Sequence, residues 1–358
     1  MVTFHSIPVK RLIKETEDCT SIEFDVPENL IDTYRYKQGQ HVTVRLMLDG
    51  EDVRRTYSVC TSPQEKKLKV AVKKVDMGRM STYINDKLKE GDVMELMPPS
   101  GSFNTDLNPE NSKNYVGFAG GSGITPIISI LKSVLLTEPA STFTLVYGNR
   151  GSDSIIFKEE LEGLKNKFLD RLTIYHVFSE EQLEFDLFNG FIDRQKIEGF
   201  SKGLIDFNDT DEVFICGPEP MMLQIRDALT EMGMDKKKIH IELFTSPVGK
   251  LGVRSAVKKE VDKKTIKSQI TVIQDGNKYE FALITDDPIL DAAMKTGADL
   301  PYACKGGVCC TCKAKLVEGE VSMDINYALE PEEVEAGFIL TCQAHPKTSK
   351  VVINYDEN

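Results

Sequence analysis

The chain has 358 residues, 41% of them hydrophobic and 28% charged, and its formal net charge at pH 7 is −12. This length is enough for two or three domains with well-filled cores, and the composition excludes a disordered or low-complexity chain. The acidic balance argues against nucleic acid as the main partner. We expect no membrane span, because the most apolar stretch, residues 117–136, contains a glycine-rich turn, Pro126 and Lys132.

The cysteine content and the N-terminal residues bear on where the protein works. The chain has eight cysteines, and residues 1–19 contain no apolar run of the length that a signal peptide needs. Cysteines in a chain without an export signal are typical of the reducing cytoplasm, where they serve as metal ligands or buried thiols. We therefore expect a cytoplasmic protein.

Residues 1–108 are predicted to form a small β-barrel. The segment 20–26 alternates apolar and polar residues and stops at Pro27, as a half-buried strand does. One short helix is expected at 81–88. Several short strands separated by turn residues favour a barrel. The further strands are predicted at 40–48, 55–59, 68–75 and 93–97.

Residues 109–245 change to alternating strands and helices, which is typical of a parallel sheet with helices on both faces. The first strand, 115–119, leads through a glycine-rich turn into a helix at 127–136. The remaining strands are predicted at 142–147, 172–178, 212–216 and 239–243, and the remaining helices at 154–167 and 220–232.

A Gly-, Ser- and Lys-rich linker, residues 246–267, precedes a third domain at 268–358. This domain opens with a predicted hairpin that turns at Asp275-Gly276-Asn277, and its first helix stops at Gly297, a natural C-cap. The pattern indicates a small α+β domain. Its strands are predicted at 269–273, 278–283, 313–316 and 351–353, and its helices at 288–296 and 331–336.

Cysteine spacing in the third domain predicts an iron–sulfur site. Cys304, Cys309 and Cys312 follow the C-x4-C-x2-C spacing of plant-type [2Fe-2S] proteins, and Cys342 can supply the fourth thiolate. Glycines between the first two cysteines let the backbone curl around a cluster and aim N–H groups at the sulfurs. A zinc site or disulfides are the alternatives, but structural zinc sites usually pair two C-x2-C or similar units, and here there is one.

The glycine-rich turn of the second domain can hold a pyrophosphate. Gly121-x-Gly123-x-x-Pro126 lies between a strand and a helix. Small residues allow close backbone approach, and the helix N-terminus offers free N–H groups and a positive dipole end. The alternative is a tight strand-to-helix turn without a ligand.

Two segments of the barrel can hold a flavin. Arg55 offers a fork for a phosphate and Tyr57 a flat face for stacking, although such residues on a strand are more often ordinary barrel surface. A turn leading into a helix start, suited to a second phosphate, follows at Gly78-Arg79-Met80-Ser81-Thr82.

These motifs, in this order, resemble the ferredoxin–NADP reductase superfamily, with a plant-type β-grasp ferredoxin domain fused at the C-terminus. The resemblance covers the whole chain. It implies that Tyr57 stacks on the isoalloxazine of FAD, that Ser58 lies near the flavin N5, and that Arg55 binds the pyrophosphate. Segment 78–82 matches the second FAD-phosphate motif, which implies FAD-binding roles for Gly78, Met80, Ser81 and Thr82.

The resemblance also assigns residues to NAD(P)H. Cys216 begins a C-G-P element that lies beside the nicotinamide, and Glu242 and Phe244 match an E-x-aromatic ending whose ring covers the other flavin face. Ser58, Cys216 and Glu242 are thus the residues expected nearest the reacting atoms. Without the resemblance, Cys216 is better explained as a buried core thiol and Phe244 as core packing. The matched pyrophosphate-loop residues are Gly121, Gly123 and Thr125.

Two features point in opposite directions for the coenzyme. NADP-dependent members of the superfamily often carry Ser-Arg after the third strand of the sheet, whereas this chain has Ser179-Glu180. Glu180 would repel a 2′-phosphate and could hold a ribose diol instead. Arg150, after the second strand, can reach a 2′-phosphate with a bidentate fork. We expect NADPH, with NADH possible.

The last third resembles the reductase components of bacterial phenylacetyl-CoA epoxidases, in segments 300–312, 327–333 and 340–346. In plant-type ferredoxins the position of Cys310 is often Ser, so we expect a non-ligand there. The resemblance implies electron transfer from NAD(P)H through FAD and the cluster to an oxygenase. The alternatives are the reductase of another oxygenase, such as a ring-hydroxylating dioxygenase or a hydroxylase, and a non-catalytic electron carrier.

Charge is uneven along the chain. Residues 268–358 contain 15 acidic residues and 7 lysines, whereas residues 246–267 contain 7 basic and 2 acidic residues. Such runs are commonly solvated faces. The alternative is that the acidic third domain docks on a basic patch of the oxygenase, since electron carriers use electrostatic steering.

Overall fold

The computed structural model describes residues 4–244, 268–283 and 286–357. The linker predicted at 246–267 lies outside the described residues. Residues 6–244, apart from 54–56, make one compact unit, and the C-terminal region belongs to a second. No helix of the described part of the chain is long and apolar enough to cross a membrane.

The N-terminal part forms a six-stranded sheet in the order β4-β3-β6-β1-β2-β5, with antiparallel pairing between β1 and β2, β2 and β5, and β3 and β6. A bridge between Val59, just after β4, and Val70 in β5 joins the two outer strands. The sheet therefore closes on itself, as predicted for a barrel. Its strands are β1 (His5–Thr16), β2 (Cys19–Phe24), β3 (His41–Leu48), β4 (Glu51–Ser58), β5 (Leu68–Lys73) and β6 (Val93–Leu96).

The sequence prediction omitted β1, the longest barrel strand. Its burial does not alternate regularly, because the pairing with β2 shifts register between Val9 and Arg11 and again between Lys14 and Thr16. Bulges of this kind erase the period-2 pattern on which strand prediction depends. The barrel helix α1 (Arg79–Asp86) begins two residues before its predicted start.

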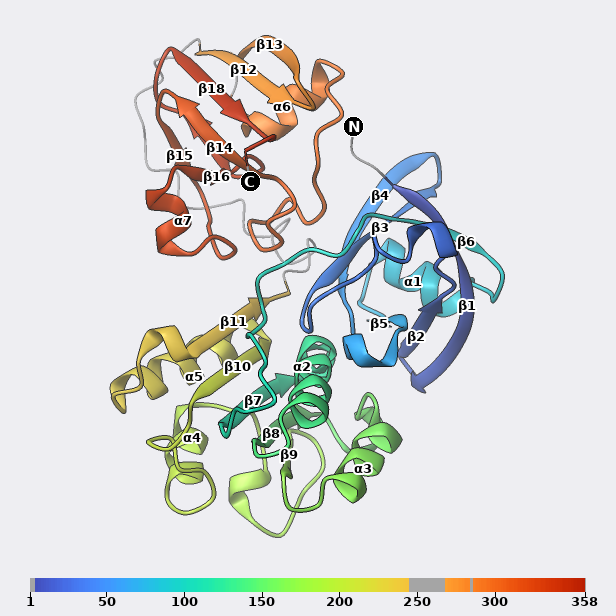
Figure 1. The fold of residues 1–358 in the computed structure, drawn as a ribbon, viewed down its shortest axis with the longest axis vertical. Helices are drawn as coiled ribbons and strands as arrows, with labels where there is room; N and C mark the ends of the chain where they lie inside the picture. The colour runs from blue at the N-terminus through green and yellow to red at the C-terminus, as the bar shows by residue number, and fades with distance from the viewer. Residues whose placement is uncertain (1–3, 245–267, 284–285, 358) are drawn as a thin grey trace. The chain divides into compact units, whose positions relative to one another are not determined.

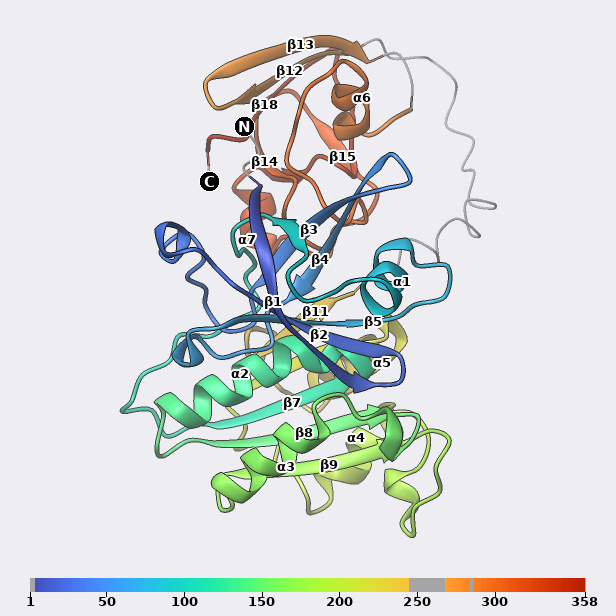
Figure 2. The ribbon, with the colours of Figure 1, turned by 90° about the vertical axis from the view of Figure 1, so that its right-hand side faces the viewer.

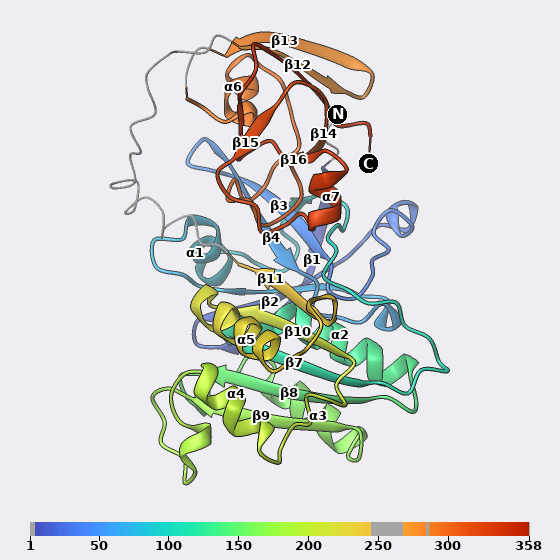
Figure 3. The same ribbon diagram turned by 90° about the vertical axis from the view of Figure 1, so that its left-hand side faces the viewer.

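The second part is a five-stranded parallel sheet in the order β11-β10-β7-β8-β9. Helices α2 (Ile124–Thr137) and α3 (Lys158–Lys167) cover one face, and α4 (Arg194–Ser201) and α5 (Glu219–Glu231) cover the other (Figures 2 and 3). The strand order reverses between β7 and β10, which creates a crevice at their carboxyl ends. The strands are β7 (Asn114–Gly120), β8 (Thr142–Asn149), β9 (Leu172–Phe178), β10 (Glu212–Gly217) and β11 (Ile239–Leu243).

Two helices of this part differ from the prediction. Helix α3 starts at Lys158 and not at residue 154, because the buried Phe157 adopts a left-handed backbone with φ of 62° and interrupts the helix. Helix α4 was not predicted. It starts at an Asp193 N-cap whose side chain accepts the Lys196 N–H, a signal that the prediction did not use.

The C-terminal region folds around a mixed sheet in the order β13-β12-β18-β14-β16, with β12 and β18 parallel (Figure 1). Helix α6 (Ile289–Lys295) contributes to its core, and α7 (Pro331–Glu335) is a single exposed turn. The strands are β12 (Ser268–Gln274), β13 (Asn277–Leu283), β14 (Lys313–Glu318), β16 (Phe338–Leu340) and β18 (Lys350–Asn354), with a separate pair, β15 (Val321–Met323) and β17 (Ala344–Pro346). The predicted α+β class is confirmed; β15, β16 and β17, three residues each, were missed.

A partly buried carboxylate, Glu212, links the start of β10 to neighbouring elements. Glu212 accepts hydrogen bonds from Lys113 Nζ at 2.7 Å and Thr105 Oγ1 at 2.9 Å, and it lies 3.2 Å from His240 Nε2. Burial raises the pKa of Glu212, but the hydrogen bonds from His240, Lys113 and Thr105 outweigh it and lower the pKa from 4.5 to about 2. The ionised form is thus stabilised by folding.

We expect this carboxylate to make stability fall at acid pH. Because the pKa is lower in the folded state, the contribution is complete above the unfolded value and is lost as the pH falls from about 5 toward 2. At pH 3.5 the loss is about 1 to 2 kcal/mol. Urea unfolding followed by circular dichroism should show a flatter pH dependence for Glu212→Gln. The exposed Glu110→Gln serves as control, and equal slopes for both variants would contradict the assignment.

Candidate functional site

The predicted pyrophosphate loop sits at the crevice between β7 and β10. Gly121 has φ of +52°, which favours glycine, and a Cβ at this position would clash with nothing, the nearest atom being Lys73 Nζ at 4.0 Å. A Cβ on Gly123 would overlap the backbone carbonyl of Cys216, so this glycine is required for α2 to approach β10. The hydroxyl of Thr125 is buried and donates to Ser122 O at 3.0 Å, so this side chain shapes the turn. Any contact of Thr125 with a nucleotide would have to come from its backbone.

Cys216 and Glu242 are direct register partners on β10 and β11, at the carboxyl ends of these strands. The Cys216 side chain is fully buried, and burial, followed by the nearby Glu242, raises the pKa of its thiol well above the usual value. The thiol is therefore protonated and fits a packing or positioning role rather than a nucleophilic one. Phe244 follows β11 and is 39% exposed.

Glu242 also connects the sheet to the barrel. Its Oε1 lies 3.5 Å from Nδ1 of His41, at the start of β3. The adjacent Gln40 accepts the Val59 N–H, which places Ser58 close by at the end of β4. Sequence reasoning brought Ser58, Cys216 and Glu242 together through the resemblance, but it missed His41, which nothing in the local sequence distinguishes.

Two buried polar atoms at this place lack hydrogen-bond partners among the described residues. They are Ser58 Oγ and Glu242 Oε2. Buried polar atoms in folded proteins are nearly always satisfied, so orphaned ones point to a missing partner. A flavin with its ring N–H and carbonyl groups is a partner of suitable chemistry, and the residues present therefore fit the group that the sequence motifs predict.

The other flavin motifs occupy β4 and the start of α1. Arg55 and Tyr57, two residues apart on β4, project from the same face of the strand. Gly78 is the N-cap of α1, and a Cβ there would overlap the side chains of Ser81 and Val75.

Two of the residues predicted in this second motif use their side chains within the protein. Met80 is 1% exposed and belongs to the barrel core. The Ser81 hydroxyl is engaged with Val75 N and Gly78 O, both at 3.2 Å. Met80 and Ser81 can therefore meet a phosphate only through the backbone N–H groups at the start of α1.

The four predicted cluster cysteines lie as two contacting pairs in the C-terminal region. The thiol of Cys304 contacts that of Cys309, and the thiol of Cys312 contacts that of Cys342. Within the described residues no group of three or more His, Cys, Asp or Glu side chains is placed to hold a metal ion. Two dithiol pairs match instead a [2Fe-2S] cluster, which takes two thiolates on each iron.

Backbone and amide N–H groups surround these sulfurs. The Gly306 N–H donates to Cys304 Sγ at 3.2 Å, and Gln343 Nε2 lies 3.7 Å from Cys342 Sγ. The hydrogen bond from Cys309, together with those from the loop backbone, outweighs burial and lowers the pKa of Cys304. The pKa of Cys342 is also lowered, first by Cys312. In each pair, hydrogen bonds thus stabilise one cysteine as the thiolate, the form that iron requires.

The remaining cysteine of the loop is used differently. Cys310 donates its S–H to Ala328 O at 2.9 Å, while its neighbour Cys309 is 4% exposed and belongs to a dithiol pair. This geometry supports the expectation that Cys310 is not a ligand. Gly307 has φ of +76°, and a Cβ there would lie 2.8 Å from Ile325 O, so the loop needs glycine at this position.

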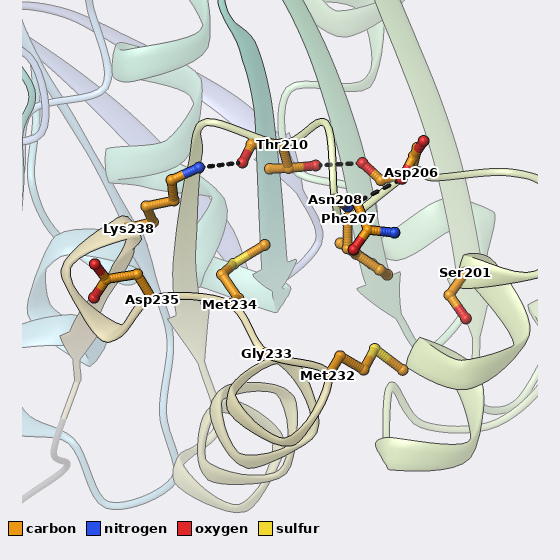
Figure 4. Close-up of a pocket in the computed structure, with 10 residues that line it drawn as sticks. All are labelled: Ser201, Asp206, Phe207, Asn208, Thr210, Met232, Gly233, Met234, Asp235 and Lys238. Atoms are coloured by element: carbon orange, nitrogen blue, oxygen red, sulfur yellow. Dashed lines mark hydrogen bonds between the residues drawn. The ribbon is translucent and has the colours of Figure 1, made fainter.

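Two cavities lie away from these residues. One, of about 530 Å³, opens beside the amino ends of β10 and β11 (Figure 4). The other, of about 580 Å³, lies between α3 and β9. None of the predicted site residues lines either of them, and ligands of open parallel sheets bind at the opposite, carboxyl edge.

Comparison with known protein families identifies the three parts of the chain. Residues 6–105 match the family described as oxidoreductase FAD-binding domain, residues 118–227 the oxidoreductase NAD-binding domain, and residues 272–347 the 2Fe-2S iron-sulfur cluster binding domain. FAD, pyridine-nucleotide and [2Fe-2S] domains are thus all present, in the predicted order.

Similar proteins share this arrangement. A subunit of the 1,2-phenylacetyl-CoA epoxidase of Escherichia coli (strain K12) is 46% identical over 99% of both chains. The ferredoxin reductase component of 3-ketosteroid-9-alpha-monooxygenase of Rhodococcus rhodochrous is 33% identical over 98% of this chain and 96% of its own.

Solved structures agree on the fold. Phthalate dioxygenase reductase superposes with a TM-score of 0.59 at 24% identity, over 98% of both chains. A type IV self-sufficient cytochrome P450 monooxygenase superposes with a TM-score of 0.69 at 22% identity, and there the match spans 98% of this chain and 41% of the longer one. The chain therefore belongs to the family of oxygenase reductases that join an FAD-binding, an NAD-binding and a [2Fe-2S] ferredoxin domain in one polypeptide.

Proposed function

We propose that this protein is the reductase component of a phenylacetyl-CoA epoxidase, carrying electrons from NADPH to the oxygenase. The observation that carries the choice of oxygenase is the 46% identity to one component of a phenylacetyl-CoA epoxidase over nearly the full length of both chains. The domain bounds we propose are 1–108 for FAD, 109–245 for the nucleotide, 246–267 for the linker and 268–358 for the ferredoxin.

The proposed flavin site combines stacking groups, phosphate donors and polar atoms near the ring. Tyr57 and Phe244 would cover the two faces of the isoalloxazine, and Arg55 would hold the pyrophosphate. Ser58 and Glu242 would satisfy ring atoms with the side-chain oxygens that otherwise lack partners among the described residues. The backbone at Gly78–Thr82 would bind a phosphate at the start of α1.

When bound, FAD would supply the conversion of the two electrons of a hydride into single-electron transfers, and the [2Fe-2S] cluster would supply their passage onward. The protein's share is placement and exclusion of water. Gly121 and Gly123 would let the backbone approach a nucleotide pyrophosphate, and Cys216, which is fully buried, would limit the space in which a nicotinamide can lie. The N–H groups around Cys304 and Cys342 would tune the cluster's potential.

The proposed partner surface is the acidic ferredoxin domain. Residues 268–358 hold 15 acidic residues and 7 lysines, and the exposed turn α7 contributes Glu332 and Glu335. A basic patch on the oxygenase would complement this charge. The protein would work in the cytoplasm. A second candidate is the reductase of another oxygenase, which the 33% identity to a 3-ketosteroid monooxygenase component supports.

An anaerobic absorption titration with NADPH, and separately with NADH, tests the relay. We expect the flavin and Fe–S bands both to bleach. NADPH should act faster, because Arg150 offers a fork for its 2′-phosphate. Faster bleaching by NADH would indicate that Glu180 determines the coenzyme preference, and it would overturn the NADPH proposal. A protein without flavin, or one that neither nucleotide reduces, would instead be a non-catalytic carrier.

Exchanging single cysteines tests the ligand set. Cys342→Ser should remove or disturb the cluster, because one iron loses a thiolate, while flavin reduction by the nucleotide continues. Cys310→Ser is the matched control and should keep both spectra, since its thiol is turned to a carbonyl. The iron content and the absorption spectrum of each variant distinguish these outcomes. An unchanged cluster in Cys342→Ser, or its loss in Cys310→Ser, would refute the assignment.

Reconstitution with purified oxygenase components tests the partner. Phenylacetyl-CoA should be consumed only when this protein and nucleotide are both present, and the rate should fall as salt rises above about 0.15 M because docking is electrostatic. A ring-hydroxylating oxygenase serves as comparison. If that system accepts the electrons and the epoxidase does not, the second candidate replaces the first.

A further inference from the structure

Asp18 holds a carboxylate between two cations of the nucleotide site. It lies in the two-residue turn between β1 and β2, where Thr16 pairs with Cys19. Its Oδ2 is 3.1 Å from Arg150 NH2 and 3.6 Å from Lys73 Nζ. Its Oδ1 accepts the Thr16 hydroxyl at 2.9 Å. The turn and this hydrogen bond fix the carboxylate in place.

The two cations stand at different parts of the predicted coenzyme site. Lys73 ends β5, and its Nζ is 4.0 Å from the position that a Cβ on Gly121 would take, beside the pyrophosphate loop. Arg150 follows β8, and its carbonyl accepts the N–H groups of Glu180 at 2.9 Å and Glu181 at 3.2 Å. Lys73 would thus lie nearest the pyrophosphate of a bound coenzyme, and Arg150 nearest the far ribose.

We propose that Asp18 is an internal counter-ion which coenzyme phosphates displace, and which thereby sets the affinity for NADPH relative to NADH. The proposal rests on the assignment of Arg150 to the 2′-phosphate. The Arg150 side chain is 57% exposed and that of Asp18 29%, so the pair is open to exchange. Partly exposed ion pairs contribute up to about 1 kcal/mol, whereas a phosphate dianion offers an arginine fork a charge-assisted, bidentate partner.

NADH and NADPH compete with Asp18 for different cations. NADH brings only a pyrophosphate, which competes for Lys73, the more distant of the two partners. NADPH must also displace Asp18 from Arg150, which is the closer of the two cations to that carboxylate. Removing the charge of Asp18 therefore assists both coenzymes but assists NADPH more. A carboxylate that merely joined the β1–β2 turn to the nucleotide domain would have the opposite effect, because its loss would loosen the site for both.

Steady-state kinetics of Asp18→Asn in the full protein test this inference. We expect the KM for NADPH to fall about 5-fold, the factor that corresponds to about 1 kcal/mol, with NADH changing 2-fold or less and kcat unchanged. Glu95→Gln, which removes a partly exposed carboxylate from Arg45 in the same barrel, should change neither KM. Unchanged or raised KM values for NADPH in Asp18→Asn would overturn the proposal.

Binding of adenosine 2′,5′-bisphosphate, compared with AMP, separates this inference from the proposed electron relay. Asp18→Asn should tighten the bisphosphate about 5-fold in calorimetry and leave AMP little changed, whether or not nucleotides reduce the flavin. In an Arg150→Gln background the gain should disappear. Equal binding by wild type and Asp18→Asn, or a gain that survives without Arg150, would refute the counter-ion even if the flavin bleaches normally.

Discussion

The burial of α2 on all sides is the constraint on which the flavin and nucleotide parts depend. Twelve of its 14 residues are buried, including polar Ser129 and Ser133. One side packs on the parallel sheet and the other on the barrel, since Cys19, Cys60 and Ala71 of the barrel share a core with its isoleucines. A helix that is mostly apolar and buried on all its faces needs a packing partner on each side. Because α2 starts at the glycine loop, this packing also fixes the loop against the barrel.

Ion pairs around Lys132 link α2 to the barrel and to α3. Lys132 of α2 is 4% exposed at its side chain, and its ammonium contacts Glu65 of the barrel at 2.9 Å and Glu160 of α3 at 2.6 Å. Lys69 of β5 lies 3.3 Å from Glu160 as well. Burying the Lys132 charge costs several kcal/mol, so its ion pairs contribute little net stability, but leaving this buried charge unpaired would cost more. We infer that these ion pairs select one docking of the barrel on α2.

The sequence alone was informative where one residue type carries the chemistry. The C-x4-C-x2-C spacing predicted the ferredoxin domain and the strand–glycine–helix order predicted the nucleotide domain, because both patterns are local. Other parts depend on long-range contacts that no local pattern records. Gly123 was expected to face a phosphate, and it also packs on the carbonyl of Cys216, which is distant in the sequence. Asp18 and Lys73 carried no motif at all. Strand β1 was missed because its bulges break the alternation that a strand prediction requires.

The cluster loop shows why spacing was so informative there. Lys305 and Cys310, each directly after a cysteine of the first dithiol pair, both have φ of 50°. Non-glycine residues pay about 1 kcal/mol or more in this region, and such conformations persist where the surroundings impose them. The turn at Lys305 reverses the chain just after Cys304, so that the Gly306 N–H points back at the Cys304 sulfur. A chain that must place several thiols and their donors around one cluster has few alternatives. The number of residues between the cysteines is therefore restricted by the cluster, and the spacing alone indicates the site.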